Sequence, residues 1–257
     1  MTELFQKATE FVQRRIPCAL CTVVRTAGSV PRHPGSKMLV DGNGVLLAGT
    51  IGGGAMENRI LQESRRCIAE GKPRLISLKL TDPAAGDPGV CGGTLEIFIE
   101  PLLTQPTLLI IGAGHVGRAL THLAKWCGFH VILADDRPEL CNAEACPGAD
   151  EYLSAPVSET LAQISLTSQT CVAMVTRGYP LDVDLLPALL RAPLAYLGVI
   201  GSERRWLTAS KALREKGIGD ADLARVHAPI GIEIGAETPE EIAVSIMAEI
   251  VRVSRKS

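Results

Sequence analysis

The chain has 257 residues, with 26 Lys and Arg against 28 Asp and Glu, so its formal net charge is −2. This length supports a sizeable core and predicts two domains. The absence of a basic cluster argues against nucleic acid binding, no apolar run is long enough to span a bilayer, and the first residues lack the pattern of a signal peptide. We therefore expect a cytoplasmic protein whose eight cysteines are reduced.

The first hundred residues combine two amphipathic helical patterns with short apolar strands. The helices are expected at residues 2–15 and from Met56 to Gly71. Prolines at positions 101 and 106 bracket a short segment that predicts a linker. The strands of this half are expected at about 17–26, 36–41, 44–50, 74–80 and 94–99.

Beyond the linker, apolar strands alternate with amphipathic helices, which predicts a doubly wound parallel sheet. The expected fold class is α/β, with a Rossmann-like domain of residues 104–257 preceded by a smaller α+β domain of residues 1–103. The last helix is expected to begin after Thr238 with a capping box to Glu241. The other elements of this half are strands at 107–111, 129–134, 151–153, 170–175 and 194–199, and helices at 115–127, 157–164, 182–190 and 203–216.

A Gly-x-Gly-x-x-Gly turn joins the first of these strands to its helix, with glycines at 112, 114 and 117. In dinucleotide-binding folds such a turn places a phosphate at the helix N-terminus. An acid follows the next strand just over twenty residues later, so Asp135 or Asp136 suits a ribose. The turn therefore predicts a nucleotide or other phosphate ligand contacted by Gly112, Gly114 and Gly117.

Other polar residues are expected at the carboxyl edge of the same sheet, where open α/β folds bind ligands. Ser202 also suits the N-cap of the next helix, and the charged residues have solvent exposure as their alternative interpretation. The candidates for ligand contact are His115, Arg177, Ser202, Arg204, Arg205 and His227.

Three segments of the first domain place glycine where backbone can approach a ligand. The loop 28–38 carries Ser29 and Arg32 and suits an anion, or is a rigid turn with solvated cations. The run Gly52, Gly53, Gly54 leaves backbone N–H groups at a helix start, and Glu57 either caps that helix or accepts from a ligand.

The third segment is Cys91 followed by Gly92 and Gly93. Glycine backbone leaves the thiol accessible and supplies N–H groups that stabilise a thiolate. A thiolate is soft, so Cys91 is a candidate for holding a persulfide or contacting a sulfur-loving metal, with an inert turn cysteine as the alternative.

Zinc ligation by Cys18, Cys21, Cys141 and Cys146 is disfavoured. Cys18 and Cys21 have C-x-x-C spacing but fall in an expected strand, where residues three apart face opposite sides. Small buried thiols are expected instead at Cys18, Cys21, Cys67, Cys127 and Cys171.

Taken together, these segments resemble the XdhC/CoxI family of xanthine dehydrogenase accessory proteins over nearly the whole chain. The motifs that carry the resemblance are the segments 28–32, 52–57, 91–93, 112–117, 198–202, 229–231 and 234–239.

The resemblance implies that the chain binds molybdenum cofactor and protects it while a cysteine desulfurase helps to install its terminal sulfido ligand. The cofactor is then delivered to an apo molybdenum hydroxylase of the xanthine dehydrogenase type. On this interpretation Cys91 lies near the molybdenum or the transferred sulfur, and Ser29, Arg32, Glu57 and the glycines contact the cofactor. A homodimer whose cradles face one another across the dimer is compatible with this interpretation.

Two other functions remain open at this point. An NAD(P)-dependent oxidoreductase fits the glycine turn, although no general-base dyad is evident in the sequence. A nucleotide-binding regulatory protein without turnover fits the same turn.

Overall fold

The computed structural model describes residues 1–80, 92–102 and 105–254. The chain divides into two compact units, Met1–Thr104 and Gln105–Ser257, and each is described by itself. Within the described ranges, no helix combines the length and the apolar character needed to cross a membrane.

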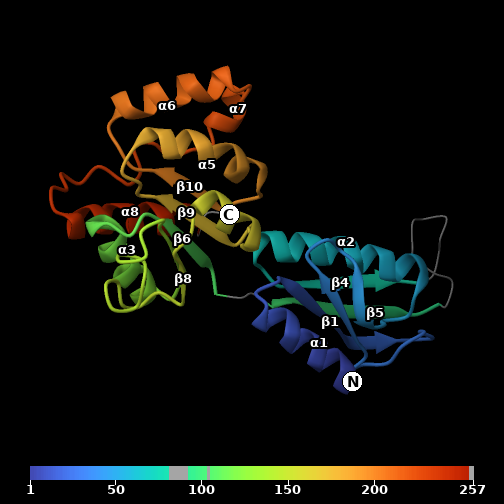
Figure 1. Ribbon diagram of the computed structural model, residues 1–257. Helices are drawn as coiled ribbons and strands as arrows, with labels where there is room; N and C mark the ends of the chain where they lie inside the picture. Colours follow the sequence, from blue (N-terminus) through green and yellow to red (C-terminus); the bar gives the residue numbers. More distant parts are fainter. Residues whose placement is uncertain (81–91, 103–104, 255–257) are drawn as a thin grey trace. The chain divides into compact units, whose positions relative to one another are not determined.

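The first unit is a five-stranded antiparallel sheet with a helix on each face (Figure 1). Its strand order is β3-β2-β1-β5-β4. Helix α2 (Gly54–Glu70) covers one face and α1 (Thr2–Gln13) covers the other. The strands are β1 (Cys18–Ala27), β2 (Lys37–Asp41), β3 (Leu46–Gly49), β4 (Arg74–Lys79) and β5 (Thr94–Leu102).

Alternate side chains of β1 point to opposite faces of the sheet, so this one strand packs against both helices. Cys21 packs with Met56 and Ile60 of α2, whereas Cys18 packs with Leu4 of α1. Side chains in a strand point alternately to the two faces, so residues three apart are separated by the sheet. This confirms the expectation that Cys18 and Cys21 face opposite sides, and the two thiols cannot share a zinc ion.

Strand β5 is longer than expected, because it continues through Pro101 to Leu102. Its pairing with β4 ends at Ile99, whereas its pairing with β1 extends to the partners Cys18 and Leu102. Beyond Ile99 one side of β5 is therefore an edge, where the missing N–H of proline interrupts no ladder. The expected linker is shortened accordingly.

The second unit is a five-stranded parallel sheet with helices on both faces (Figure 1). The order β10-β9-β6-β7-β8 places the first strand of the unit at the centre, as in a Rossmann fold, and the expected fold class is confirmed. The strands are β6 (Thr107–Ile111), β7 (His130–Ala134), β8 (Glu151–Leu153), β9 (Thr170–Met174) and β10 (Tyr196–Val199).

Alternate residues of these strands feed two separate cores. Leu108 and Ile110 of β6 pack with α3 and α8, whereas Leu109 and Ile111 pack with α4, α5 and α6. The helices and the short 3₁₀ segment of this unit are α3 (His115–Trp126), α4 (Val157–Thr160), η2 (Leu161–Gln163), α5 (Tyr179–Arg191), α6 (Glu203–Glu215), α7 (Asp220–Leu223) and α8 (Pro239–Ser254).

Two helix starts can be compared with the expectations from the sequence: α8 begins as expected, whereas α5 begins earlier. Thr238 and Glu241 form the expected capping box, with the Thr238 N–H 3.0 Å from Glu241 Oε2 and the Glu241 N–H 3.3 Å from Thr238 Oγ1. Helix α5 instead begins at Tyr179, three residues before the expected start at 182. Pro180 lies in its first turn, where an N–H has no partner within the helix.

Cysteine burial follows the expectation with one exception. Cys18, Cys21, Cys67 and Cys171 are buried, and burial raises the pKa of the Cys21 and Cys171 thiols to about 12. Cys127 is exposed, so the expectation of a buried thiol there is wrong. It is the C-cap of α3 and lies beyond the buried stripe of that helix.

Gly117→Ala should destabilise the second unit by about 1–3 kcal/mol, because an added Cβ would overlap the carbonyl oxygen of Gly112. Gly114→Ala is the matched control, since an added Cβ there meets no atom within 4 Å. Urea unfolding monitored by tryptophan fluorescence is specific to this unit, because Trp126 and Trp206 are the only tryptophans of the chain. Equal midpoints for the two variants would contradict the packing role of Gly117.

Candidate functional site

The glycine turn of the second unit lies at the carboxyl edge of the sheet, between β6 and α3. Gly112 has a φ of +116°, and an added Cβ would contact the carbonyl group of Val175. Gly114, the N-cap of α3, has neither a positive φ nor a neighbour within 4 Å of an added Cβ. Packing therefore explains Gly112 and Gly117, whereas Gly114 leaves an open surface that a ligand can approach.

Asp135 is bound by the protein itself. Its carboxylate is 4% exposed and accepts from the Ala113 N–H at 2.7 Å and the Arg137 N–H at 3.0 Å. Arg137 also donates to it from its guanidinium at 2.8 and 2.7 Å. Burial alone would raise the pKa of Asp135, but these donors outweigh it and lower the pKa to about 2. A ribose at this carboxylate would have to compete with Arg137.

Asp136 and Arg177 form an ion pair of 2.6 Å at the same edge. Asp136 follows β7 and Arg177 follows β9, and these two strands flank β6 in the sheet. The pair therefore spans the end of β6. Both side chains are about half exposed, at 43% for Asp136 and 57% for Arg177, so Arg177 is accessible to an anion that competes with Asp136.

Ser202 and Arg205 have structural roles in this unit. The Ser202 hydroxyl caps α6 by accepting from the Arg205 N–H at 3.3 Å. The Arg205 guanidinium donates to the fully buried Asp182 at 2.6 Å and to the Thr176 hydroxyl at 2.7 Å. The Arg205 guanidinium ties α6 to α5, so a ligand at Arg205 would have to compete with Asp182 and Thr176. Arg204 is exposed.

A buried carboxylate at Glu249 is not among the residues predicted from the sequence. Its side chain accepts from Tyr196 Oη at 2.7 Å and from the Gly231 N–H at 2.8 Å, and lies 3.1 Å from His227 Nδ1. Burial and the neighbouring Glu249 raise the pKa of Tyr196. The available signal in the sequence was the position of Glu249, three residues after the buried Ile246 of α8. Charged residues are rarely buried without partners, so a glutamate at this position indicates a buried polar contact.

In the first unit, two of the predicted ligand loops lie against each other. An added Cβ on Gly28 would be 3.1 Å from the Gly92 carbonyl oxygen, and one on Gly93 would overlap the Ser29 carbonyl oxygen. Ser29 and Gly92 are exposed at this contact. The structure thus brings the loop after β1 and the start of β5 together.

The glycine run before α2 joins the same cluster. An added Cβ on Gly52 would be 2.8 Å from Cγ of Pro31, which is the neighbour of the exposed Arg32. Ser29, Arg32, Gly52, Gly92 and Gly93 therefore belong to adjoining loops at one end of the sheet. We call this set of loops (residues 28–32, 50–54 and 92–93) the glycine-loop cluster.

The N–H groups of the run Gly52–Gly54 are less free than expected. The Glu57 carboxylate accepts from the N–H of Ile51 at 3.3 Å and of Gly53 at 3.2 Å, and from the Thr50 hydroxyl at 2.6 Å. The Gly52 N–H donates to the Thr50 hydroxyl oxygen at 3.1 Å. Of the two roles open for Glu57, the structure shows the capping one, and its carboxylate occupies the position of an anion in this loop.

Cys91, the residue expected to carry the sulfur chemistry, lies outside the described residues, although it directly precedes Gly92 in the sequence. Nowhere in residues 1–80, 92–102 or 105–254 do three or more His, Cys, Asp or Glu side chains gather as a metal site requires.

Comparison with known families agrees with this architecture. Residues 108–250 match the model of the XdhC Rossmann domain, and residues 11–79 match that of the XdhC and CoxI family. The chain belongs to the XdhC/CoxI family. The resemblance seen in the sequence motifs is thereby confirmed.

The relatives of the chain include three curated bacterial proteins. It is 36% identical to the uncharacterized protein YqeB of Escherichia coli (strain K12), over 99% of this chain and 47% of that protein. It is 32% identical to a probable xanthine dehydrogenase subunit of Bacillus subtilis (strain 168), over 63% of this chain and 47% of that protein. The molybdenum cofactor insertion chaperone PaoD of E. coli is 22% identical over 91% of this chain and 82% of PaoD. The chain thus spans about half the length of the first two relatives.

A solved structure shares the fold. A crystal structure described as a xanthine dehydrogenase from Bacillus halodurans matches 98% of this chain and 95% of its own chain, with a TM-score of 0.53 and 20% identity.

Asp135 should make the stability of the second unit depend on acid pH. Its pKa is lower in the folded protein, at about 2, than its ordinary value of 3.8, so its stabilising effect is present above pH 4 and disappears as the pH falls through 2. We expect the difference in unfolding free energy between wild type and Asp135→Asn to shrink by about 2 kcal/mol between pH 4 and pH 2. Urea titrations at each pH measure it, and a constant difference would contradict the ion-pair geometry.

Proposed function

We propose that this chain is an accessory factor that binds molybdenum cofactor, supports its sulfuration together with a cysteine desulfurase, and delivers it to an apo molybdenum hydroxylase of the xanthine dehydrogenase type. The observation that carries the proposal is the glycine-loop cluster, in which the family motifs at 28–32, 52–57 and 92–93 adjoin. The names of PaoD and of the B. subtilis relative support the same assignment.

The residues of this cluster fit the chemistry of the cofactor. Molybdenum cofactor is a pterin with a terminal phosphate, a dithiolene and a metal–oxo centre, so it presents several anionic groups to a protein. Arg32 supplies an exposed guanidinium, Ser29 an exposed hydroxyl and Gly92 exposed backbone with no atom within 4 Å of an added Cβ. These groups donate hydrogen bonds and leave room for close approach.

In this proposal the cofactor supplies the reactive groups, and the residues of the chain bind and orient it. When bound, the cofactor supplies the molybdenum and its terminal sulfido ligand. Arg32, Ser29 and the glycine backbone bind and orient it, whereas Glu57 fixes the glycine loop from within by accepting its N–H groups. Cys91 is the proposed contact to the molybdenum or the transferred sulfur.

The alternative of an NAD(P)-dependent oxidoreductase is weakened by Asp135. A dinucleotide site of this fold uses the acid after the second strand for the ribose hydroxyls. Here that carboxylate already accepts from Ala113 and Arg137 and is 4% exposed. We therefore do not assign hydride transfer to the second unit.

Cys91→Ala should activate the apo hydroxylase at least tenfold less well than wild type, because the soft sulfur contact is lost. Cys127→Ala is the matched control, since Cys127 is an exposed thiol in the other unit. Activation is measured by the activity that the hydroxylase gains, alongside the molybdenum content and pterin fluorescence of the purified chain. Full activation and full cofactor binding by Cys91→Ala would rule out the proposed role.

Arg32→Gln should weaken cofactor binding about tenfold, the effect expected for one lost charge-assisted hydrogen bond to an anion. Arg14→Gln removes an exposed guanidinium from the C-cap of α1 in the same unit and should bind as wild type does. Quenching of pterin fluorescence gives both dissociation constants. Equal affinities for the two variants would remove Arg32 from the binding site.

A further inference from the structure

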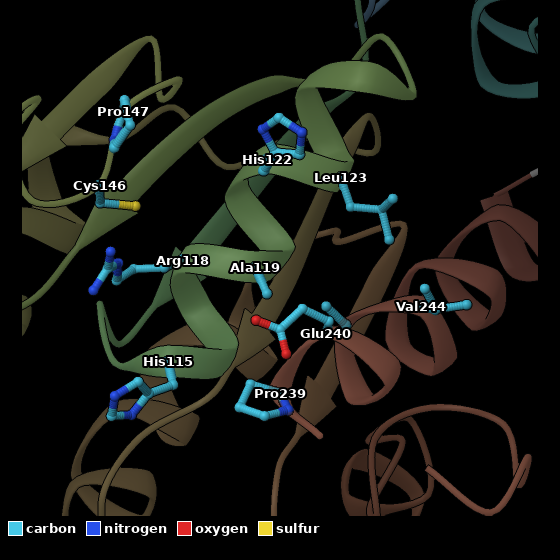
Figure 2. Close-up of a pocket in the computed structure, with 11 residues that line it drawn as sticks. His115, Arg118, Ala119, His122, Leu123, Cys146, Pro147, Pro239, Glu240 and Val244 are labelled. Carbon is cyan, nitrogen blue, oxygen red and sulfur yellow. The ribbon is translucent and has the colours of Figure 1, made fainter. Parts of the chain in front are cut away.

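The second unit contains a pocket of about 520 Å³ between α3 and α8 (Figure 2). This volume falls within the usual range of small-molecule sites. Side chains from both helices line it, together with Cys146 and Pro147 of the segment that follows β7. We call it the α3–α8 pocket, and it contains no residue of the glycine-loop cluster.

Two helix N-termini open onto this pocket. Helix α3 begins at His115 and α8 begins at Pro239, and both residues line it (Figure 2). The start of α3 carries N–H groups without partners inside the helix and the positive end of a dipole, whereas the start of α8 is already closed by the capping box of Thr238 and Glu241. Gly114, where an added Cβ would meet no described atom within 4 Å, directly precedes His115. One end of the pocket is therefore suited to an anion.

Arg118 lies one turn along α3 and lines the same pocket. Its guanidinium differs from those at the carboxyl edge, because Arg137, Arg177 and Arg205 are each held by an aspartate. Within the described residues, no hydrogen bond or ion pair holds the Arg118 side chain, and it is exposed. It is thus available to a ligand.

The rest of the pocket suits a ring. Ala119, Leu123 and Val244 give it apolar walls. Glu240 points toward Ala119 in Figure 2, so its carboxylate lies beside this part of the apolar lining. A carboxylate there repels a second phosphate but accepts hydrogen bonds from the amino group of a nitrogen heterocycle.

We propose that the α3–α8 pocket binds a phosphate monoester joined to a nitrogen heteroaromatic ring. The phosphate lies at the His115 and Arg118 end, and the ring lies between Ala119 and Val244 with its amino group on Glu240. A free nucleotide and the phosphate-bearing pterin of the cofactor both have this chemistry. The site goes beyond the proposed function, because it lies in the second unit and uses none of the glycine-loop cluster.

The first test is calorimetric titration of the full chain with AMP, GMP, CMP and UMP. We expect at least one to bind, and Arg118→Gln to weaken that binding tenfold or more through loss of a charge-assisted contact. The matched control is Lys211→Gln, which removes an exposed cation from α6 of the same unit and should leave binding unchanged. Unfolding midpoints equal to wild type show that both variants fold.

A second variant separates the ring from the phosphate. Ala119→Leu adds bulk to the apolar wall and should abolish nucleotide binding while inorganic phosphate binds as in wild type. If neither Arg118→Gln nor Ala119→Leu changes nucleotide affinity, the proposal is overturned.

The molybdenum cofactor is the other titrant. If no nucleotide binds, but Arg118→Gln and Ala119→Leu both weaken cofactor binding, the pterin phosphate is the occupant. If wild type binds no nucleotide and both variants bind cofactor normally, the pocket has no such ligand. Arg32→Gln distinguishes the failure of this proposal from the failure of the proposed function. If only Arg32→Gln loses cofactor binding, the glycine-loop cluster binds the cofactor and the α3–α8 pocket does not.

Discussion

The contact on which the carboxyl edge of the second unit depends is the hydrogen bond from the Ala113 N–H to the Asp135 carboxylate. It fastens the turn after β6 to the end of β7, and Arg137 holds the same carboxylate from its other side. The position of the turn sets where α3 begins. The open face of Gly114 and the direction in which the first N–H groups of α3 point both follow from this one buried charge.

The spacing of apolar residues and the positions of glycine, proline and capping residues predicted most of the helices and strands. These signals work because strands and helix caps depend on residues that are neighbours in the sequence. The capping box at Thr238 formed as expected, and the alternation of strands and helices correctly predicted a parallel sheet. The side-chain partners of charged residues could not be predicted. Arg205 reaches Asp182 across 23 positions, and Glu249 meets Tyr196 across 53, so only the packed fold brings them together.

The glycine-loop cluster shows the same limit in another form. Each of its motifs could be identified separately in the sequence. That they lie together in the fold depends on the register of β1 with β5, in which Ala27 is the partner of Thr94. That pairing places Gly28 beside Gly93. Two strands so far apart in the chain carry no local signal of their partnership. Nor does the sequence reveal that Glu57 turns back onto its own loop, since a glutamate in a first helical turn equally suits a ligand.

The Asp136–Arg177 ion pair has a consequence for the end of β6, which it spans. Exposed ion pairs contribute only about 0–1 kcal/mol, so the closed arrangement exceeds the open one by roughly fivefold at most. Counter-ions weaken such a pair further as ionic strength rises. The crossing over β6 is therefore a contact that thermal motion breaks and remakes continually, and the salt of the surrounding solution sets the fraction of time for which the end of the strand is uncovered.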